Sequence, residues 1–402
     1  MNLICKYCNQ KFHSHNFDCP VLAKINIYKK IDLQLKKDFF GEAPNVFVGK
    51  YGYPNINVGI LSTNKYENHD DPLLWSKENF ESNKIISLRS ELVNSRFNAH
   101  IKSNDKIIDI TREISLSKKP VDVEINLKEA PKIRITLGAD VMPHGPAVDI
   151  QNAQITQNVH IPTKVDKVVN DELKAAESLD ILSRSGFDEH YLTKIFSLGN
   201  LGIKEDKKIV PTRWSITAVD DTIGKKIIRE IHDKTQIGYS IYFGGLLGNY
   251  FLVMFFPEMF SYELYEMFVG KSDTYTTESE WNTDYEDFNG RKEYATETAG
   301  GYYAARIAVL EKLKGLNKCG SALVLRFITD DYSVPLGVWV VRNATRNSLN
   351  SKQVNFSTRE EMMNYAKIFI RNRFNYDIGK IIKSSKILNN SRQKSLSIFF
   401  KN

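Results

Sequence analysis

The sequence lacks the long apolar run that a membrane-spanning helix needs. Nowhere in its 402 residues does a stretch approach about 18 consecutive apolar residues without charge. The first residues, MNLICKYC, also lack the charged and then apolar pattern of a secretory signal. These absences predict a protein with no membrane partner, and we expect it in the cytoplasm. With 42% hydrophobic residues, the chain still has ample apolar mass for a buried core.

Cysteine is also scarce, and its distribution argues against a disulfide framework. Of four cysteines, three lie within the first nineteen residues, in the string CKYCNQKFHSHNFDC, and Cys319 stands alone. A C-x₂-C step followed by a His-x₃-Cys step is typical of a closed, tetrahedral zinc site. We therefore predict a structural zinc knuckle in residues 1–24, with His13 as an alternative fourth ligand. The predicted ligands are Cys5, Cys8, His15 and Cys19.

Acidic residues are absent from the last part of the chain. Residues 379–402 contain six Lys or Arg, no Asp or Glu, and many Ser and Asn. This composition predicts a basic, disordered and flexible tail. The tail carries most of the net charge of +7, so the rest of the chain is close to neutral. Net charge alone is therefore no argument that the body binds nucleic acid.

The tail ends in a pattern that predicts docking on another protein. A Gln is followed three positions later by Leu and then by a pair of Phe, and a 3₁₀ turn would place the apolar side chains on one face. Because such a string is rare at a C-terminus by chance, its position favours a binding role. The alternative is that the two rings fold back onto the body. The predicted docking residues are Gln393, Leu396, Phe399 and Phe400.

Residues 25–378 have the pattern of a mixed α/β or α+β body that contains a sheet, with a possible subdivision near 160–165. The expected strands are two within 45–61, around a turn at 51–54, and others at 121–126, 132–136, 210–219, 239–243, 249–256, 322–327 and 337–341. The expected helices are 23–35, 73–97, 165–186, 222–232, 299–313 and 358–373.

Five arginines lie beside aromatic, Asn or Gly residues and are candidates for binding nucleic acid. The guanidinium group matches phosphate, and a neighbouring aromatic ring can stack on an unpaired base. If these segments converge, they would form a groove for single-stranded or branched DNA. The alternative is that the aromatics are core residues and each arginine pairs with a carboxylate. The candidates are Arg89, Arg96, Arg213, Arg306 and Arg342.

Asp220 and Asp221 follow the strand predicted at 210–219. Metal-dependent phosphodiester enzymes often place a carboxylate at the end of a strand, where it binds Mg²⁺ or Mn²⁺. The alternative is that Asp221 caps the helix predicted at 222–232. A nuclease activity is therefore one hypothesis for the body.

Six segments together resemble the archaeal Nre proteins. They are VFVGKYGYPNINVGIL, LRSELVNSR, VPTRWSITAVDD, ETAGGYYAARIAVLEKL, PLGVWVVR and QKSLSIFF. The resemblance implies a DNA repair protein from an archaeon that docks on the PCNA sliding clamp through the C-terminal motif. It also implies a cysteine cluster, although the family pattern has Cys where this chain has His15.

The resemblance implies no reaction and no catalytic residue. Three functions therefore stay open. They are a clamp-recruited protein that binds damaged or branched DNA, a metal-dependent nuclease or other nucleic-acid-processing enzyme, and an adaptor between the clamp and another repair factor.

Overall fold

The computed structural model describes residues 36–131, 144–270, 280–332 and 334–390, and the chain divides into two compact units. The first unit comprises Met1–Ile223 and Ser333–Gly337, and the second comprises Gly224–Tyr332 and Val338–Asn402. The subdivision suggested near 160–165 falls within the first unit. The predicted zinc knuckle and clamp motif both lie outside the described residues, as does the strand predicted at 132–136.

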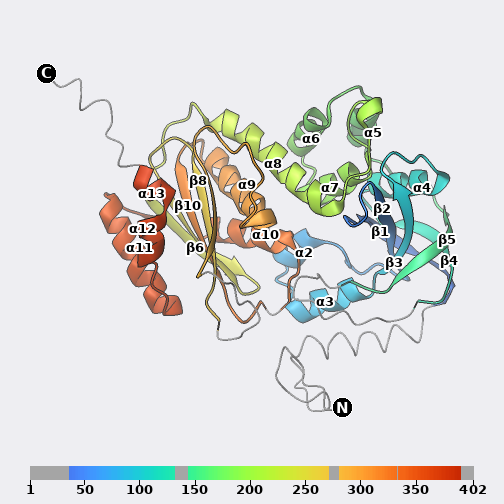
Figure 1. Cartoon of the computed structure of the whole chain (residues 1–402), viewed down its shortest axis with the longest axis horizontal. Helices are drawn as coiled ribbons and strands as arrows, with labels where there is room; N and C mark the ends of the chain where they lie inside the picture. The colour runs from blue at the N-terminus through green and yellow to red at the C-terminus, as the bar shows by residue number, and fades with distance from the viewer. Residues whose placement is uncertain (1–35, 132–143, 271–279, 333, 391–402) are drawn as a thin grey trace, which may run out of the picture. The chain divides into compact units, whose positions relative to one another are not determined.

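The described part of the first unit is built on a closed barrel of five strands (Figure 1). The strands are β1 (Asp38–Val48), β2 (Asn55–Thr63), β3 (Val93–His100), β4 (Val121–Leu127) and β5 (Ala147–Ile155). Their order around the barrel is β1-β2-β3-β5-β4. β3 and β5 run parallel, whereas the other neighbours are antiparallel. Every second residue of β4 is fully buried from Val121 to Leu127, which is the period of a strand with one buried face.

One helix, α4 (Lys106–Leu116), connects β3 to β4 and packs Ile108 and Ile114 into the barrel core. This strand order, with a helix between the third and fourth strands, is the topology of an OB-fold, a five-stranded Greek-key barrel. The other helical elements that lie wholly within this unit follow β2 or β5. They are α2 (Pro72–Lys77), α3 (Ser82–Ser90), α5 (Thr163–Asn170), α6 (Ala175–Arg184), α7 (Glu189–Ser197) and η1 (Lys204–Asp206).

The described part of the second unit contains a six-stranded sheet in the order β11-β6-β7-β10-β8-β9. Its strands are β6 (Ser240–Leu246), β7 (Asn249–Phe256), β8 (Tyr262–Phe268), β9 (Asn282–Glu286), β10 (Ser321–Ile328) and β11 (Val354–Asn355). β8 and β10 are parallel. Helices cover both faces, so this unit has three layers (Figure 1). One face carries α9 (Ala299–Gly315) and α10 (Val338–Leu349), and the other carries α11 (Arg359–Phe374), α12 (Gly379–Ser384) and α13 (Lys386–Asn390).

The structure confirms a mixed α/β fold and several individual predictions. The strands within 45–61 and those at 121–126, 239–243, 249–256 and 322–327 are present, as are the helices at 299–313 and 358–373. The helix predicted at 73–97 is instead two short helices and β3. Asn79, with φ of 50°, follows the end of α2 in the left-handed region, where a regular helix cannot continue. The helix predicted at 165–186 is likewise divided into α5 and α6.

The strands predicted at 210–219 and 337–341 are wrong. The first lies in α8 (Thr212–Ile231), which contains the division between the two units, and the second enters α10. Both segments are rich in β-branched residues, which favour strands. However, Val219, Ile223, Ile227 and Ile231 of α8 are buried at intervals of four residues, and this is the spacing of a helix face.

The flexible tail predicted from residue 379 is wrong for residues 379–390, because these form α12 and α13. Three apolar side chains of the two helices, Ile381, Ile387 and Leu388, lie in the core of the second unit. The buried carboxylate of Glu263 in β8 accepts hydrogen bonds from Ser385 Oγ and from two backbone N–H groups at the start of α13, at 2.6–3.2 Å. The many basic residues of this segment led to the prediction of disorder. Its few apolar side chains nevertheless bury enough surface to order it.

Candidate nucleic-acid-binding site

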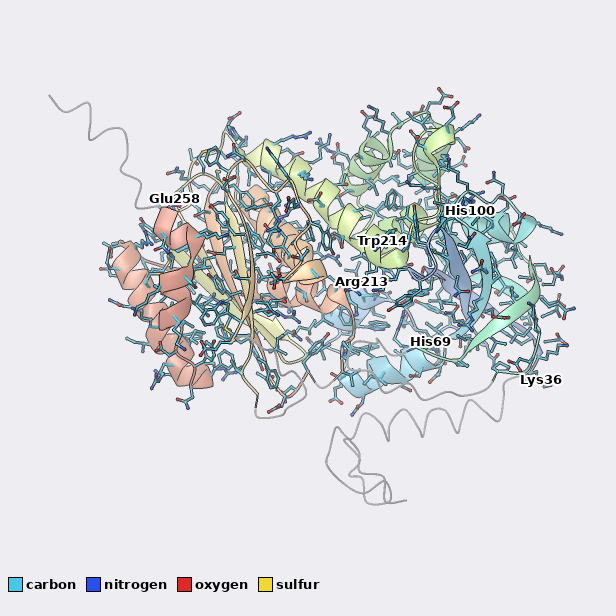
Figure 2. The ribbon with its side chains drawn as sticks, in the orientation of Figure 1. Lys36, His69, His100, Arg213, Trp214 and Glu258 are labelled. Carbon is cyan, nitrogen blue, oxygen red and sulfur yellow. The ribbon has the colours of Figure 1, made fainter. Side chains whose placement is uncertain are left out.

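The loop between β1 and β2 presents exposed aromatic side chains beside basic ones. Tyr51 is 80% exposed, Tyr53 is 43% exposed, and Trp214 at the start of α8 is 46% exposed. The ring centroids of Tyr53 and Trp214 are 5.2 Å apart. Nζ of Lys50 lies 5.0 Å from the ring centroid of Tyr51, and Arg213 is exposed beside Trp214 (Figure 2). We call these five residues the aromatic patch.

Hydrogen bonds within the first unit bring the two halves of the aromatic patch together. The N–H of Val48, at the end of β1, donates to Oγ1 of Thr212 at 2.9 Å and so holds the start of α8 beside the loop. The N–H of Ile101 donates to the carbonyl of Pro54 at 3.0 Å, which anchors the other end of the loop. The patch is therefore supported by hydrogen-bonded backbone on both sides, although it joins residues more than 150 positions apart.

The outward side of β2 and β3 continues this surface with polar side chains. Asn55, Asn57 and Gly59 lie opposite His100, Asn98 and Arg96 respectively. Asn57, Asn98 and His100 are exposed. Arg96 is partly exposed and forms an ion pair with Asp149 at 3.2 Å. Because alternate residues of a strand share one face, Arg96 lies in one row with the exposed Asn98 and His100.

The structure divides the five candidate arginines by burial. Arg89 is buried in an ion pair with Asp70 in the first unit. Arg306 is buried in the second unit, with Nη1 2.8 Å from Oε2 of Glu286, and Arg342 is also buried there. In these positions the three arginines are buried, and Arg89 and Arg306 each form an ion pair with a carboxylate. Arg213 and Arg96 are the two candidates that lie on the surface of the first unit.

Asp220 and Asp221 do not lie at the end of a strand. Both are in α8, where Asp220 is fully buried and Asp221 is partly exposed. Neither residue caps the helix, because α8 starts at Thr212. Within the ranges that the structure describes, no group of three or more His, Cys, Asp or Glu side chains could hold a metal ion. The strand-end geometry that suggested Mg²⁺ or Mn²⁺ is thus absent at these two residues.

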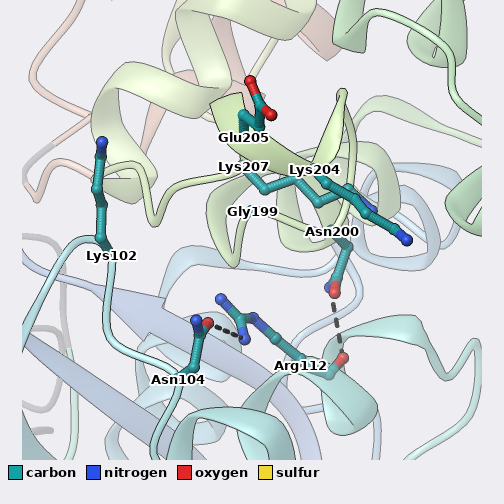
Figure 3. Close-up of a pocket in the computed structure, with 8 residues that line it drawn as sticks. All are labelled: Lys102, Asn104, Arg112, Gly199, Asn200, Lys204, Glu205 and Lys207. Atoms are coloured by element: carbon teal, nitrogen blue, oxygen red, sulfur yellow. Dashed lines mark hydrogen bonds between the residues drawn. The ribbon is translucent and has the colours of Figure 1, made fainter.

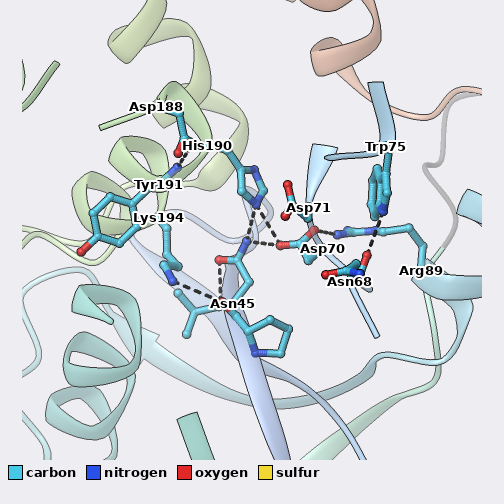
Figure 4. Close-up of polar contacts among 12 residues, drawn as sticks. Asn45, Asn68, Asp70, Asp71, Trp75, Arg89, Asp188, His190, Tyr191 and Lys194 are labelled. Atoms are coloured by element: carbon cyan, nitrogen blue, oxygen red, sulfur yellow. Dashed lines mark hydrogen bonds and ion pairs between the residues drawn. The ribbon is translucent and has the colours of Figure 1, made fainter. Parts of the chain in front are cut away.

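A buried polar cluster around Asp70 was not predicted from the sequence (Figure 4). The Asp70 carboxylate accepts hydrogen bonds from Arg89 in α3 and from Nδ2 of Asn45 in β1. Nε2 of His190, in α7, lies 3.0 Å from Oδ2 of Asp70. The side chain of His190 is 37% exposed, whereas that of Asp70 is almost fully buried. One carboxylate thus links a strand and two helices of the first unit and reaches the surface through His190.

Burial and charge act in opposite directions on the groups of this cluster. Burial alone would raise the pKa of the Asp70 carboxyl, but the nearby Arg89 and His190 hold it well below its usual range. Burial would lower the pKa of His190, yet its interaction with Asp70 raises it overall. Lys194 of α7 donates to the carbonyl of Ser117 at 2.7 Å, and burial lowers its pKa to about 8. The cluster therefore favours ionised Asp70 and protonated His190.

Comparison with known proteins identifies the family. The family described as "Archaeal Nre, N-terminal" matches residues 14–275, and "Archaeal Nre, C-terminal" matches residues 286–399. This chain belongs to the archaeal Nre family. The boundary between the two Nre matches falls after residue 275, whereas the structural units divide inside α8.

Three relatives are identical to this Nre chain at about a third of the aligned positions. The DNA repair protein NreA of Archaeoglobus fulgidus is 34% identical over 98% of both chains. The DNA repair protein NreB of the same organism is 30% identical, also over 98% of both. The DNA repair protein NreA of Haloferax volcanii is 33% identical over 79% of both. No solved structure matches the chain. In the described part of the chain, no helix is long and apolar enough to cross a membrane.

Proposed function

We propose that this protein acts in DNA repair by binding unpaired or branched DNA on the barrel of its first unit, and that its C-terminal motif recruits it to the PCNA sliding clamp. The names of the full-length relatives support the repair role. The observation that carries the DNA-binding role is the contact between two exposed rings, Tyr53 of the β1–β2 loop and Trp214 of α8.

The chemistry of the aromatic patch suits unpaired bases. OB-fold barrels bind oligonucleotides on the face of their second and third strands and on the loops between strands 1 and 2 and between strands 4 and 5. Stacking of a base on an aromatic side chain contributes about 1–3 kcal/mol and does not depend on sequence. Arg213 and Lys50 supply positive charge beside the rings, where the phosphates of the strand would lie.

Fluorescence anisotropy with labelled single-stranded, duplex and branched DNA tests this role. We expect Trp214→Ala and Tyr53→Ala each to weaken binding to single-stranded DNA by about 5- to 100-fold, because each removes one stacking surface. Phe288→Ala is a matched control, since Phe288 is also an exposed aromatic but lies in the second unit. Equal affinities for the two patch variants, the control and the unaltered protein would overturn the proposed site.

The C-terminal motif supplies the recruitment part of the proposal. Burial of Leu396, Phe399 and Phe400 would contribute roughly 5–8 kcal/mol before the entropy of ordering the peptide is subtracted. A reversible interaction in the micromolar range is the expected result. Pull-down with purified PCNA should fail after deletion of residues 391–402, while thermal unfolding stays unchanged. Clamp binding without DNA binding would instead favour an adaptor between the clamp and another repair factor.

Zinc binding by residues 1–24 is a separate part of the proposal. The string CKYCNQKFHSHNFDC places Cys5 and Cys8, and His15 and Cys19, as two close pairs with the spacing of a tetrahedral zinc site. Metal analysis of the purified protein should give about one equivalent of zinc, and Cys5→Ser should release most of it. Less than about half an equivalent in the unaltered protein would contradict a structural site.

A further inference from the structure

A basic pocket lies in the first unit (Figure 3). Its volume is about 370 Å³. The segment after β3, helix α4, and the segment from the end of α7 through η1 contribute its lining. The basic and amide side chains that line it are Lys102, Asn104, Arg112, Asn200, Lys204 and Lys207. Glu205 is its one carboxylate, so four cationic side chains face a recess with a single anionic one.

Hydrogen bonds hold Arg112 and Lys207 in this pocket. Nε of Arg112 donates to the carbonyl of Leu198 at 3.3 Å, and its Nη1 donates to Oδ1 of Asn104 at 3.0 Å. Among the described residues, Nη2 of Arg112 has no hydrogen-bond partner. Nζ of Lys207 donates to the carbonyl of Val169 at 3.0 Å. These contacts position two cationic groups in the pocket before any ligand arrives.

The protein compensates the positive charges of the pocket only in part, through an ion pair of Arg112 with Asp109 at 3.2 Å and through Glu205 in the lining. Burial lowers the pKa of Lys207, and the neighbouring Arg112 and Lys204 lower it further. Within the part of the chain that the structure describes, neither Lys102 nor Lys204 forms an ion pair with a carboxylate. Like charges that converge with little counter-charge are unfavourable. An anion in the pocket would remove this repulsion.

The pocket and the aromatic patch share one stretch of backbone. Ile101, which precedes Lys102, donates its N–H to Pro54 in the β1–β2 loop, and its carbonyl accepts from the N–H of Ile209 at 2.8 Å. Ile209 follows the pocket residue Lys207 and precedes α8, which carries Trp214. The same short segment therefore borders both features, so a nucleotide strand on the patch would reach the pocket.

We propose that this pocket binds a terminal phosphate of a DNA strand whose bases stack on the aromatic patch. This inference rests on the proposed function, because it names the part of the DNA that the first unit recognises. A phosphomonoester carries between one and a half and two negative charges at neutral pH, which suits the excess of cationic groups better than the single charge of an internal phosphodiester. A recess also admits a group that projects from a strand end, and Arg112 presents the planar fork that phosphate oxygens accept.

Anisotropy with short single strands tests the inference. Strands of about 12 nucleotides, within the range bound by one OB-fold, carry a 5′-phosphate, a 3′-phosphate or hydroxyls at both ends. We expect one phosphorylated end to bind about tenfold more tightly than the hydroxyl form, as a few charge-assisted hydrogen bonds allow. Lys204→Gln combined with Lys207→Gln should abolish this preference and change the affinity for the hydroxyl strand by less than about threefold. Lys234→Gln, at an exposed lysine of the second unit, is the matched control and should keep the preference.

Each other result has a definite meaning. Equal affinity for all three strands would overturn the pocket assignment and leave the DNA-binding function intact. A preference that survives in the double variant would also overturn it, because end recognition would then lie elsewhere. Competition by free inorganic phosphate or a mononucleotide at the same concentration as the strand would show that the pocket takes a free ligand, and would overturn the strand-end assignment. Failure to bind any strand would overturn the proposed function as well.

Discussion

Two pairs of arginine and aspartate in the first unit differ in burial, and this difference determines their contributions. Arg89 and Asp70 are both almost fully buried, so neither charge can be solvated if its partner is lost. The side chains of Arg96 and Asp149 are 44% and 55% exposed, and water can replace either partner. Removal of one member of a buried pair leaves an uncompensated charge, whereas an exposed pair contributes little.

Asp70→Asn should therefore destabilise the protein strongly. We expect a loss of about 3–5 kcal/mol in the free energy of unfolding, because Arg89 stays buried without its counter-charge. Asp149→Asn is the matched control and should cost less than about 1 kcal/mol. Urea denaturation monitored by circular dichroism measures both. Similar losses in the two variants would contradict the structural difference between the pairs.

The raised pKa of His190 predicts how its contribution depends on pH. A group whose pKa is higher in the folded state stabilises that state fully below its unfolded pKa, near 6.5. The contribution is then lost as the pH rises through the folded pKa. NMR titration of the imidazole should give a pKa above 6.5 in the unaltered protein. In Asp70→Asn the pKa should fall, because Asp70 causes the increase.

If the pKa of His190 is the same in both proteins, the Asp70 interaction is not its cause. The difference in stability between the unaltered protein and His190→Gln provides a second measurement. It should be largest below pH 6.5 and diminish above it, since only the protonated imidazole interacts strongly with the carboxylate.

At the scale of the elements, local sequence patterns predicted where strands lie better than which strands pair with one another. The alternation of buried residues in β4 and the two-residue turn at Leu247 and Gly248, both with positive φ, are visible in short windows of sequence. The parallel pairing of β3 with β5 joins segments about 50 residues apart, and no local pattern encodes it. In α8 and α10 the tertiary environment overrode the strand preference of β-branched residues.

The candidate site also has one part that the local sequence predicted and another part that it did not. The juxtaposition of an arginine and a tryptophan at 213–214 marked a surface feature that the structure exposes. The Asp70 cluster could not be predicted, because Asp70 and His190 are 120 residues apart and neither neighbourhood has a distinctive motif. The basic pocket likewise combines three segments that meet only after the barrel has closed.

Helices α12 and α13 give a prediction for truncated chains. A chain that ends at Asn390 should unfold at the same temperature as the full chain, because the removed residues include none of the core contacts described for α12 and α13. A chain that ends at Ile378 loses three buried apolar side chains, each contributing about 1.5–3 kcal/mol, and leaves the Glu263 carboxylate without three donors. We expect a decrease of several degrees or more in Tm, measured by differential scanning calorimetry.

A common Tm for all three chains would contradict the packing of α12 and α13 on the sheet. Glu263→Gln offers an independent measurement, since it keeps the side-chain shape and removes the charge. It should destabilise the full chain by about 1.5–3 kcal/mol, the range for hydrogen bonds to a charged group.

At the scale of the whole molecule, we expect much of the net positive charge and the DNA-binding surface to lie in different parts of the chain. Residues 391–402 carry three positive charges, Arg392, Lys394 and Lys401, whereas the aromatic patch and the basic pocket belong to the first unit. Deletion of residues 391–402 should therefore change the affinity for single-stranded DNA by less than about threefold at 150 mM salt. Anisotropy measures the affinity, and a loss comparable to that of Trp214→Ala would assign DNA binding to the C-terminal segment instead.

The end of α13 at Asn390 has a consequence for the geometry of recruitment. Only two residues, Ser391 and Arg392, separate α13 from Gln393, the first residue of the proposed clamp motif. Since an extended chain spans at most about 3.5 Å per residue, the body of a docked protein would lie within roughly 10 Å of its attachment point. A connection this short restricts rotation as well as distance. The clamp would then fix the orientation of the docked protein, besides raising its local concentration there.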